Sequence, residues 1–129
     1  MYQTGRGVAQ DMKSAVEWYM KSADQGYPNA QCNLGAMYRD GLGVFKDEVL
    51  AVEWFLKAAE QGYPNGEDEL GSMYANGRGV AHQDLLCAVE WYKKGAEQGN
   101  ADAQNNLGTM YENGRGVPKD EASAVEWYK

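Results

Sequence analysis

The stretch AVEWF at residues 51–55 returns three more times in this chain, as AVEWY at residues 15–19, 88–92 and 124–128. Its tryptophans, Trp18, Trp54, Trp91 and Trp127, are separated by 36, 37 and 36 residues. Segments of the form GxGV keep the same period, at residues 5–8, 41–44, 77–80 and 114–117. Self-similarity at a period of about 20–50 residues is typical of stacked-repeat proteins. The sequence therefore predicts a repeat array, with one loop insertion beside His82 and Gln83.

Composition limits the functions that this array can have. The chain of 129 residues fits a single domain, and 43% hydrophobic and 24% charged residues are ordinary for a folded soluble protein. The net charge of −7 argues against binding to nucleic acid or to anionic membranes. The sequence shows neither an apolar run that could span a membrane nor a signal-peptide pattern, so the compartment stays unknown. Two cysteines are too few for a disulfide framework.

The segment that contains AVEW has the spacing of a helix. Ala51, Trp54, Ala58 and Ala59 share one helical face, which predicts that the tryptophan is the large inward side chain. Glutamate precedes lysine by four residues in three units, at Glu17 and Lys21, Glu53 and Lys57, and Glu90 and Lys94. This order stabilises a helix surface by about 0.2–0.5 kcal/mol per pair. We therefore expect Ala and Trp to pack inward and Glu to pair outward with Lys.

A second helix is predicted before each of these. Ala30, Leu34, Met37 and Tyr38 share a helical face, and residues 103–111 repeat the pattern. The residues predicted inside this helix include Gly35, Gly71 and Gly108, which are expected to allow a neighbouring helix to approach closely. Gly66 also lies in it, where the equivalent residues are Ala30 and Ala103. The exchange Gly66→Ala is therefore expected to stabilise the chain by about 0.5–1 kcal/mol.

The turns between the two helices carry their own signals. The first helix is predicted to end at Gly41, Gly77 and Gly114, because glycine adopts the left-handed conformation that follows a helix end. The next helix is predicted to begin after an N-cap aspartate, at Asp11, Asp47, Asp84 and Asp120. Val44, Val80 and Val117 are expected to pack under the turn. The repeat unit is thus helix, turn, helix, turn.

The stretch AQCNLGAMYRDGLGVFKDEVLAVEWFLKAAEQG at residues 30–62 resembles a Sel1-like repeat, a relative of the tetratricopeptide repeat. The resemblance covers the whole chain. It implies an all-α fold, an α/α right-handed superhelix of about three and a half helix-turn-helix repeats that holds protein partners. We assign one domain, residues 1–129, with a partial unit at 1–29 and units at 30–65, 66–102 and 103–129, the last truncated.

The two ends of the sequence interrupt this pattern. The chain begins in the middle of one predicted helix and stops in the middle of another, which predicts either a piece of a longer array or ends that another chain covers. Helix faces that the next unit would cover are then exposed, and exposed apolar patches favour association. Contacts between unlike ends can continue without closing. We therefore expect head-to-tail self-association that depends on concentration.

Enzyme chemistry is not indicated. The GxG loops follow helices rather than strands and lack a third glycine, so a dinucleotide site is not expected. His82 is the only histidine and has no second ligand nearby in the sequence, so no metal site is expected. No nucleophile–base pattern is present, and Cys32 and Cys87 are interpreted as packed or groove-side thiols. The chain is predicted to be no enzyme and to bind no cofactor.

A candidate binding surface follows from the positions that differ between units. They lie opposite the Leu–Met–Tyr face, and by resemblance to tetratricopeptide arrays that side lines a concave groove. The groove residues are Asn29, Cys32, Ala36, Arg39, Asp40, Asn65, Asp68, Ser72, Ala75, Asn76, Asp102, Asn105, Thr109, Glu112 and Asn113. Acids outnumber the one base, and asparagine amides can bind a peptide backbone. The expected partner is a protein or extended peptide that is basic or polar; a merely soluble surface is the alternative.

The leading hypothesis is a non-catalytic protein-interaction scaffold. One rival is an enzyme or binder of a cysteine-rich branch of the family, secreted and described as binding β-lactam antibiotics. That branch carries a regular cysteine pair in each unit, whereas Cys32 and Cys87 occupy non-equivalent positions in different units. Turnover of a chromogenic β-lactam would separate the two hypotheses. A purely structural spacer in a longer protein is the third possibility.

Overall fold

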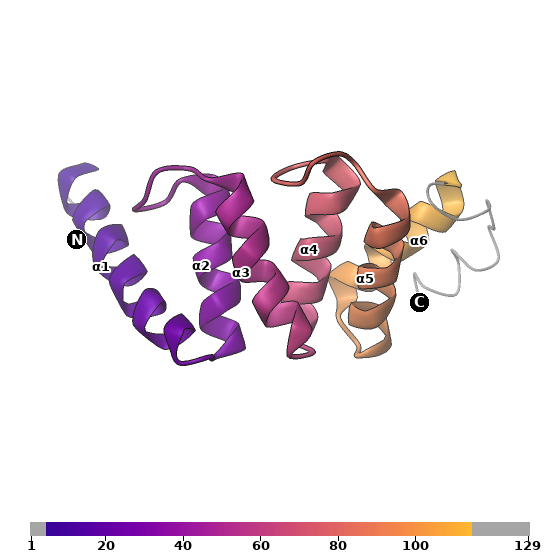
Figure 1. Ribbon diagram of the computed structural model, residues 1–129, viewed down its shortest axis with the longest axis horizontal. Coiled ribbons are helices and arrows are strands. Elements are labelled where there is room, and N and C mark those ends of the chain that lie inside the picture. Colours follow the sequence, from indigo (N-terminus) through magenta and orange to yellow (C-terminus); the bar gives the residue numbers. More distant parts are fainter. Residues whose placement is uncertain (1–4, 115–129) are drawn as a thin grey trace.

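The computed structural model describes residues 5–114, with side chains from residue 12 onward. Over these residues it contains helices and no strand, which confirms the all-α prediction. The helices are α1 (Gly5–Asp24), α2 (Pro28–Asp40), α3 (Glu48–Glu60), α4 (Pro64–Asn76), α5 (Leu85–Glu97) and α6 (Ala101–Asn113). Figure 1 shows them side by side in one row, with the connecting loops alternating between its two edges.

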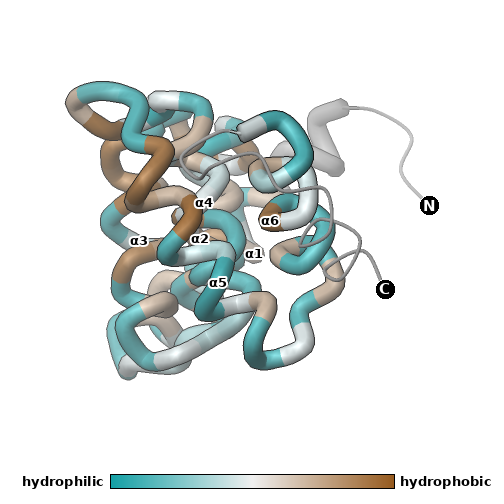
Figure 2. The backbone as a smooth tube through the Cα atoms, turned by 90° about the vertical axis from the view of Figure 1, so that its right-hand side faces the viewer, coloured by the Kyte–Doolittle hydropathy of each residue, from teal (hydrophilic) through white to brown (hydrophobic). Residues whose placement is uncertain are grey.

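The helices form two layers. Each helix packs on the next one along the chain, and α2 also contacts α4, as α4 contacts α6. We call α2, α4 and α6 the inner layer and α1, α3 and α5 the outer layer. In a curved array, helices of the same layer come close enough to touch on the concave side. The contacts of α2 with α4 and of α4 with α6 therefore place these helices on that side. Figure 2, a view along the row, shows hydrophobic stretches interrupted by hydrophilic ones. Within the described residues, no helix has the length and hydropathy needed to cross a membrane.

The helix ends confirm the predicted caps. The Asp47 side chain accepts a hydrogen bond from the Leu50 N–H, and Asp84 accepts one from the Cys87 N–H, each over 3.0 Å. The inner-layer helices end at glycines in the left-handed region, Gly41, Gly77 and Gly114, with φ of 70°, 66° and 65°. Other residues would be strained at these angles, so glycine marks each of these ends. Asp120 lies outside the described residues.

The N-cap predicted at Asp11 is wrong, because α1 runs through this residue without a break. In the next unit the equivalent aspartate is tied to the helix before it, since the Asp47 N–H donates to the Tyr38 carbonyl over 2.8 Å. The residue equivalent to Tyr38 in the first unit is Tyr2, which is outside the described residues. The GRGV segment at residues 5–8 is therefore part of α1, whereas GLGV at residues 41–44 forms a turn.

The large rings in the core belong to the residues directly after the tryptophans. Phe55 is fully buried, and Tyr92 is nearly so. A Cβ added to Gly35 would come within 2.8 Å of the Phe55 ring, and one added to Gly71 within 2.9 Å of the Tyr92 ring. The close helix approach predicted for Gly35 and Gly71 is therefore confirmed. The ring that would face Gly108 lies outside the described residues.

The prediction that the tryptophans are the inward rings is wrong. Trp18 is 70% exposed. Trp54 and Trp91 are half-buried and cover the buried clusters of the preceding helices, which include Leu34 for Trp54 and Phe55 for Trp91. Successive residues of a helix point about 100° apart, and an outer-layer helix has a neighbour on each side. Residue 55 faces the middle of its helix pair, whereas residue 54 reaches toward the preceding unit.

The predicted glutamate–lysine pairs are also wrong, because the lysines lie over the tryptophan rings. The Nζ atoms of Lys57 and Lys94 are 4.5 Å from the ring centres of Trp54 and Trp91, and the Nζ atom of Lys21 is 5.4 Å from that of Trp18. A cation over an aromatic face contributes about 0.5–1 kcal/mol at an exposed site. That exceeds an exposed ion pair on one helix, at about 0.2–0.5 kcal/mol. Glu17, Glu53 and Glu90 are exposed.

Gly66 lies within α4, as predicted, and its φ is not positive. The contacts around Gly66 nevertheless argue against the gain in stability expected from Gly66→Ala. A Cβ added here would come within 2.8 Å of the Ala58 Cβ and 3.1 Å of the Ala59 backbone nitrogen. A methyl group at this position would therefore force α3 and α4 apart, which helix propensity alone does not reveal.

The GxGV loops fold back on the outer-layer helix of the preceding unit. A Cβ added to Gly43 would come within 2.7 Å of the Met12 carbonyl oxygen, and one added to Gly79 would overlap the Glu48 carbonyl. Val44 packs on the cluster that contains Leu34, as predicted. Val80 is half-buried, and Val117 is outside the described residues. Each loop thus rests on the unit before it.

Candidate functional site

A hollow of about 250 Å³ opens on the inner layer where α2, α4 and α6 meet. It is lined by Cys32, Asn33 and Ala36 from α2, by Asn65, Asp68 and Glu69 from α4, and by Asp102 from α6. These residues occupy equivalent repeat positions that share one helical face. We call this site the inner hollow. Its lining contains three carboxylates and no cation, so it suits a positively charged or hydrogen-bond-donating group.

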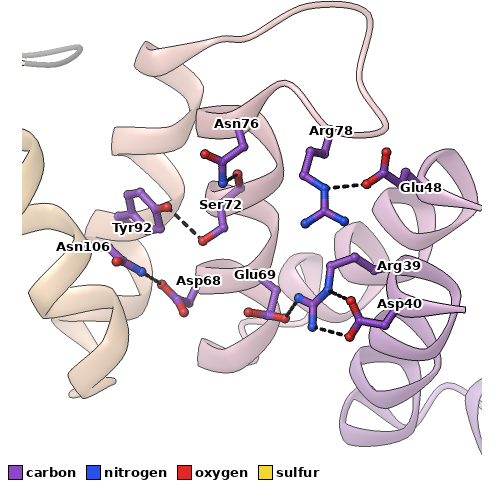
Figure 3. A network of polar contacts seen from close by, with 10 residues as sticks. All are labelled: Arg39, Asp40, Glu48, Asp68, Glu69, Ser72, Asn76, Arg78, Tyr92 and Asn106. Atoms are coloured by element: carbon purple, nitrogen blue, oxygen red, sulfur yellow. Dashed lines mark hydrogen bonds and ion pairs between the residues drawn. The ribbon is translucent and has the colours of Figure 1, made fainter. Parts of the chain in front are cut away.

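Asp68 connects two helices of the inner layer. It is 6% exposed, and its Oδ1 accepts a hydrogen bond from the Asn106 amide of α6 over 2.9 Å (Figure 3). Burial raises the pKa of Asp68 to about 6, the Asn106 hydrogen bond lowers it, and the charges of Glu69 and Asp102 raise it. The charge of the inner hollow therefore changes close to neutral pH.

Arg39, in the last turn of α2, lies beside the inner hollow without lining it. Its guanidinium donates to Glu69 of α4 and, over 3.1 Å each, to both carboxylate oxygens of Asp40 (Figure 3). These bonds hold the pKa of Asp40 below its ordinary value. The guanidinium also lies 5.7 Å from the centre of the Phe55 ring. Arg39 is thus held by internal partners and neutralises part of the charge of Glu69.

The two thiols are not arranged for nucleophilic chemistry. Burial, followed by the charge of Glu69, raises the pKa of Cys32 to about 12. Burial also raises the pKa of Cys87, and neither thiol forms a disulfide. A thiol that stays protonated at neutral pH is a poor nucleophile and a poor metal ligand. Within residues 5–114 no cluster of His, Cys, Asp and Glu could hold a metal ion, and His82 is exposed.

The structure brings part of the predicted groove together. Five predicted residues line the inner hollow: Cys32, Ala36, Asn65, Asp68 and Asp102. The others lie on inner-layer helices but do not line it: Asn29, Arg39, Asp40, Ser72, Ala75, Asn76, Asn105, Thr109, Glu112 and Asn113. Ala75 is buried in the core. The predicted surface is therefore longer than the hollow.

Some of these polar groups are engaged within the chain. The Ser72 hydroxyl lies 2.9 Å from the Tyr92 hydroxyl of α5, and the Asn76 amide donates to the Ser72 carbonyl over 3.0 Å (Figure 3). The Oδ1 of Asn65 accepts a hydrogen bond from Asn100 over 2.6 Å. Ser72 and Asn76 thus have internal partners as well as a place on the inner layer.

Sequence reasoning missed two residues of the inner hollow, Asn33 and Glu69. They occupy equivalent positions, and the residue there differs between units in the same way as at the predicted positions. The position also lies four residues after Asn29 and its equivalent Asn65, on the same helical face. A search of this face that used helical neighbours at both three and four residues would have found Asn33 and Glu69.

We expect the exchange Asp68→Asn to stabilise the chain by about 1 kcal/mol at pH 8 and by less at pH 5. The folded pKa of Asp68, about 6, lies above its ordinary value of 3.8. Its contribution to stability is complete below the lower value and is lost as the pH rises through the higher one. Asparagine removes the buried charge and keeps an oxygen for Asn106. The measurement is the urea midpoint at both pH values.

The control for this exchange is Asp24→Asn, which removes the same charge from an exposed site. With Asp24→Asn, the difference between the urea midpoints at pH 5 and pH 8 should equal that of the unmodified chain. A gain from Asp68→Asn that is equal at both pH values would contradict the assigned shift of the Asp68 pKa.

The Sel1 repeat model matches the chain four times, over residues 1–27, 28–63, 64–100 and 101–129. The chain belongs to the Sel1 repeat family. The matches within the described part divide the Sel1 repeats at the short turns between α1 and α2, α3 and α4, and α5 and α6. Our sequence-based boundaries fall two residues later. Sel1 repeat proteins are generally scaffolds for protein interactions and are typically not catalytic.

Solved structures share the Sel1 fold. A protective antigen of uropathogenic Escherichia coli with an SLR fold is 47% identical, with a TM-score of 0.85 over 90% of this chain and 25% of that one. A Sel1 repeat protein from Oxalobacter formigenes is 40% identical, with a TM-score of 0.80 over 90% and 47%. Helicobacter pylori cysteine rich protein B is 28% identical, with a TM-score of 0.69 over 93% and 85%. These likenesses confirm the all-α solenoid.

This Sel1 repeat chain thus spans about a quarter of the length of the first of these proteins and about half of the second. No curated protein matches it.

Proposed function

We propose that this chain is a non-catalytic scaffold that binds an extended, basic or polar segment of another protein along the inner layer. The observation that carries the proposal is the convergence of polar side chains from α2, α4 and α6 on one hollow. The general role of the family as a protein-interaction scaffold supports the first part of it.

The size and charge of the inner hollow favour a single long cationic side chain. Pockets for small-molecule ligands usually measure about 300–1,000 Å³, and this hollow is smaller, at about 250 Å³. Asp68, Glu69 and Asp102 face it, and the cation beside them, Arg39, is bound to Glu69 and Asp40. A Lys or Arg side chain would enter with its charge opposite two carboxylates that have no cationic partner among the described residues.

Amide side chains extend this site along the inner layer. Asn29, Asn105 and Asn113 are exposed on α2 and α6. An asparagine carboxamide offers both a donor and an acceptor. It can therefore donate a hydrogen bond to a backbone carbonyl of an extended peptide and accept one from a backbone N–H. Such contacts bind the main chain of the partner, while the inner hollow selects its side chain. The expected affinity is weak, because exposed ion pairs contribute only about 0–1 kcal/mol each.

The test is selection of random displayed peptides on the whole chain, followed by kinetics of the enriched peptides. We expect Lys- or Arg-bearing peptides whose affinity falls as the salt concentration rises. Asp102→Asn should slow association by up to about fivefold, since charges across an interface act mainly on encounter. Asn105→Ala should mainly speed dissociation, because it removes a contact made only in the bound state.

Glu53→Gln is the matched control for Asp102→Asn, since it removes one exposed negative charge from the outer layer. It should leave the association rate close to that of the unmodified chain. Peptides that bind equally at low and high salt and tolerate both inner-layer exchanges would show that the outer layer is the binding face. A selection that enriches nothing would favour a structural spacer.

A further inference from the structure

Exposed apolar side chains gather where the long loops join the helices. Phe45, in the loop between α2 and α3, is 96% exposed, more than any other large apolar residue among those described. Leu42 in the same loop is exposed, and so are Val49 and Leu86 in the first turns of α3 and α5. We call the side of the row that carries residues 41–49 and 77–86 the loop edge; it is the upper side in Figure 1. Apolar groups gathered at a surface mark interaction sites more often than isolated ones do.

The loop edge contains two equivalent hollows. The first, about 760 Å³, lies between the α2–α3 loop and α1, and its lining includes Lys13, Tyr38, Val44, Phe45 and Lys46. The second, about 740 Å³, lies between the α4–α5 loop and the start of α3. Both arise because each loop folds back on the preceding outer-layer helix. They share Lys46 and Asp47, so they lie next to each other along the loop edge.

The first hollow is positively charged, although the chain carries a net charge of −7. Lys13 and Lys46 line it and are exposed. Its one carboxylate, Asp47, is engaged as the N-cap of α3 through the Leu50 N–H. An aromatic wall flanked by two lysines complements a partner that presents an apolar side chain next to a negative one. The inner hollow has the opposite charge.

We propose that the loop edge is a second docking surface, for a segment of another protein in which an aromatic or large aliphatic side chain stands beside Asp or Glu. The apolar side chain enters the first hollow against Phe45 and Val44, and the carboxylate lies between Lys13 and Lys46. The second hollow takes a further apolar side chain one unit along. The first hollow and the inner hollow thus have opposite charges and bind partners of different chemistry.

The test is selection of random displayed peptides on the unmodified chain and on the Phe45→Ala variant. Peptides with Phe, Trp or Leu beside Asp or Glu should be recovered at least ten times more on the unmodified chain. A labelled copy of the most enriched peptide should bind at least ten times more weakly to the double variant Lys13→Glu, Lys46→Glu. Replacing its acids by Lys should have a similar effect.

Three controls separate this proposal from an effect on folding, from the loss of any exposed apolar group and from binding at the inner layer. Phe45 makes little contact with the rest of the chain, so Phe45→Ala should keep the urea midpoint of the unmodified chain. Tyr27→Ala removes an exposed aromatic group from the short turn before α2, outside the loop edge, and should keep full binding. Asp102→Asn and Asn105→Ala should also leave the binding of this peptide unchanged. The proposals for the two surfaces can therefore fail independently.

Three results would overturn the proposal. The first is a selection without an acidic, apolar class that depends on Phe45. The second is equal binding of the peptide in which Lys replaces its acids. The third is sedimentation showing a self-association of the chain that Phe45→Ala abolishes, which would assign the loop edge to a second copy.

Discussion

Replacing Phe55 by alanine is expected to lower the free energy of unfolding by about 3–5 kcal/mol, the range for removing a buried aromatic ring. Phe55 is fully buried and packs in one cluster with Ala51, Leu70 and Met73. Its ring also fills the space that Gly35 leaves on α2. The cavity would therefore open at the contact that holds α2, α3 and α4 together. Urea unfolding monitored by circular dichroism measures the loss.

The matched comparison for this prediction is the tryptophan of the same five-residue motif. Trp18→Ala removes a larger ring, but one that is 70% exposed, so a loss below about 1 kcal/mol is expected. Trp54→Ala should fall between the two, since Trp54 is half-buried over the cluster that contains Leu34. A loss from Trp18→Ala as large as that from Phe55→Ala would mean that the tryptophan is the inward ring after all.

Gly66→Ala is expected to lower the free energy of unfolding by about 1–3 kcal/mol, the usual cost of overpacking. The new methyl carbon would lie 2.8 Å from the Ala58 Cβ and close to the backbone of α3, which cannot rotate away. The gain in helix propensity, up to about 1 kcal/mol, is smaller than this cost. The urea midpoint of the variant should therefore fall.

Adding Ala58→Gly to Gly66→Ala should recover much of the loss. The double variant reproduces an arrangement that the chain already contains, since Gly95 of α5 faces Ala103 of α6 at the equivalent positions. There a Cβ added to Gly95 would come within 3.0 Å of the Ala103 Cβ. Ala58→Gly alone should be destabilising, so recovery in the pair cannot come from that exchange by itself. A midpoint that rises with Gly66→Ala alone would show that α3 and α4 can separate at no cost.

The sequence predicted the helices and, except at Asp11, the caps of the described helices that it named, because these depend on neighbouring residues. Asp47 caps α3 through an N–H three residues away, and Gly41 ends α2 through its own φ. The choice of inward ring depends on two neighbouring helices at once. Ala51 and Ala58 share a face with Trp54 as well as with Phe55, so helical spacing alone fits both. Only the packing of α2 and α4 on α3 decides between them.

Differences between the units contained further information about contacts. Where the outer-layer ring is Phe55, the inner-layer residue is Ala36; where it is Tyr92, the residue is Ser72, which hydrogen-bonds to the tyrosine hydroxyl. The two glycines outside the repeat pattern, Gly66 and Gly95, each face an alanine. Comparing how equivalent residues change together would have predicted both contacts.

The candidate site was less predictable. Helical spacing predicted which face of the inner-layer helices carries the site, but it did not predict that Asp68 is buried. The partner of Asp68, Asn106, stands 38 residues later, and the pair forms only because α4 and α6 touch. Arg39 and Glu69 meet in the same way across α2 and α4. These contacts depend on the curvature of the array, which a single repeat does not determine.

The alternation between Ala58–Gly66 and Gly95–Ala103 determines where the array can be divided for building new proteins. A cassette cut at the short turns would separate α3 from α4. It could then place Ala58 of α3 against Ala103 of α6, where the packing leaves room for only one of the two methyl groups. A cassette cut at the long loops keeps each such pair intact. It separates the contacts of Gly35 with Phe55 and of Gly71 with Tyr92, and a junction that brings Tyr92 opposite Ala36 would lose the hydrogen bond to Ser72 without a clash of backbones. The interchangeable module of this chain is therefore an outer-layer helix with the inner-layer helix that follows it.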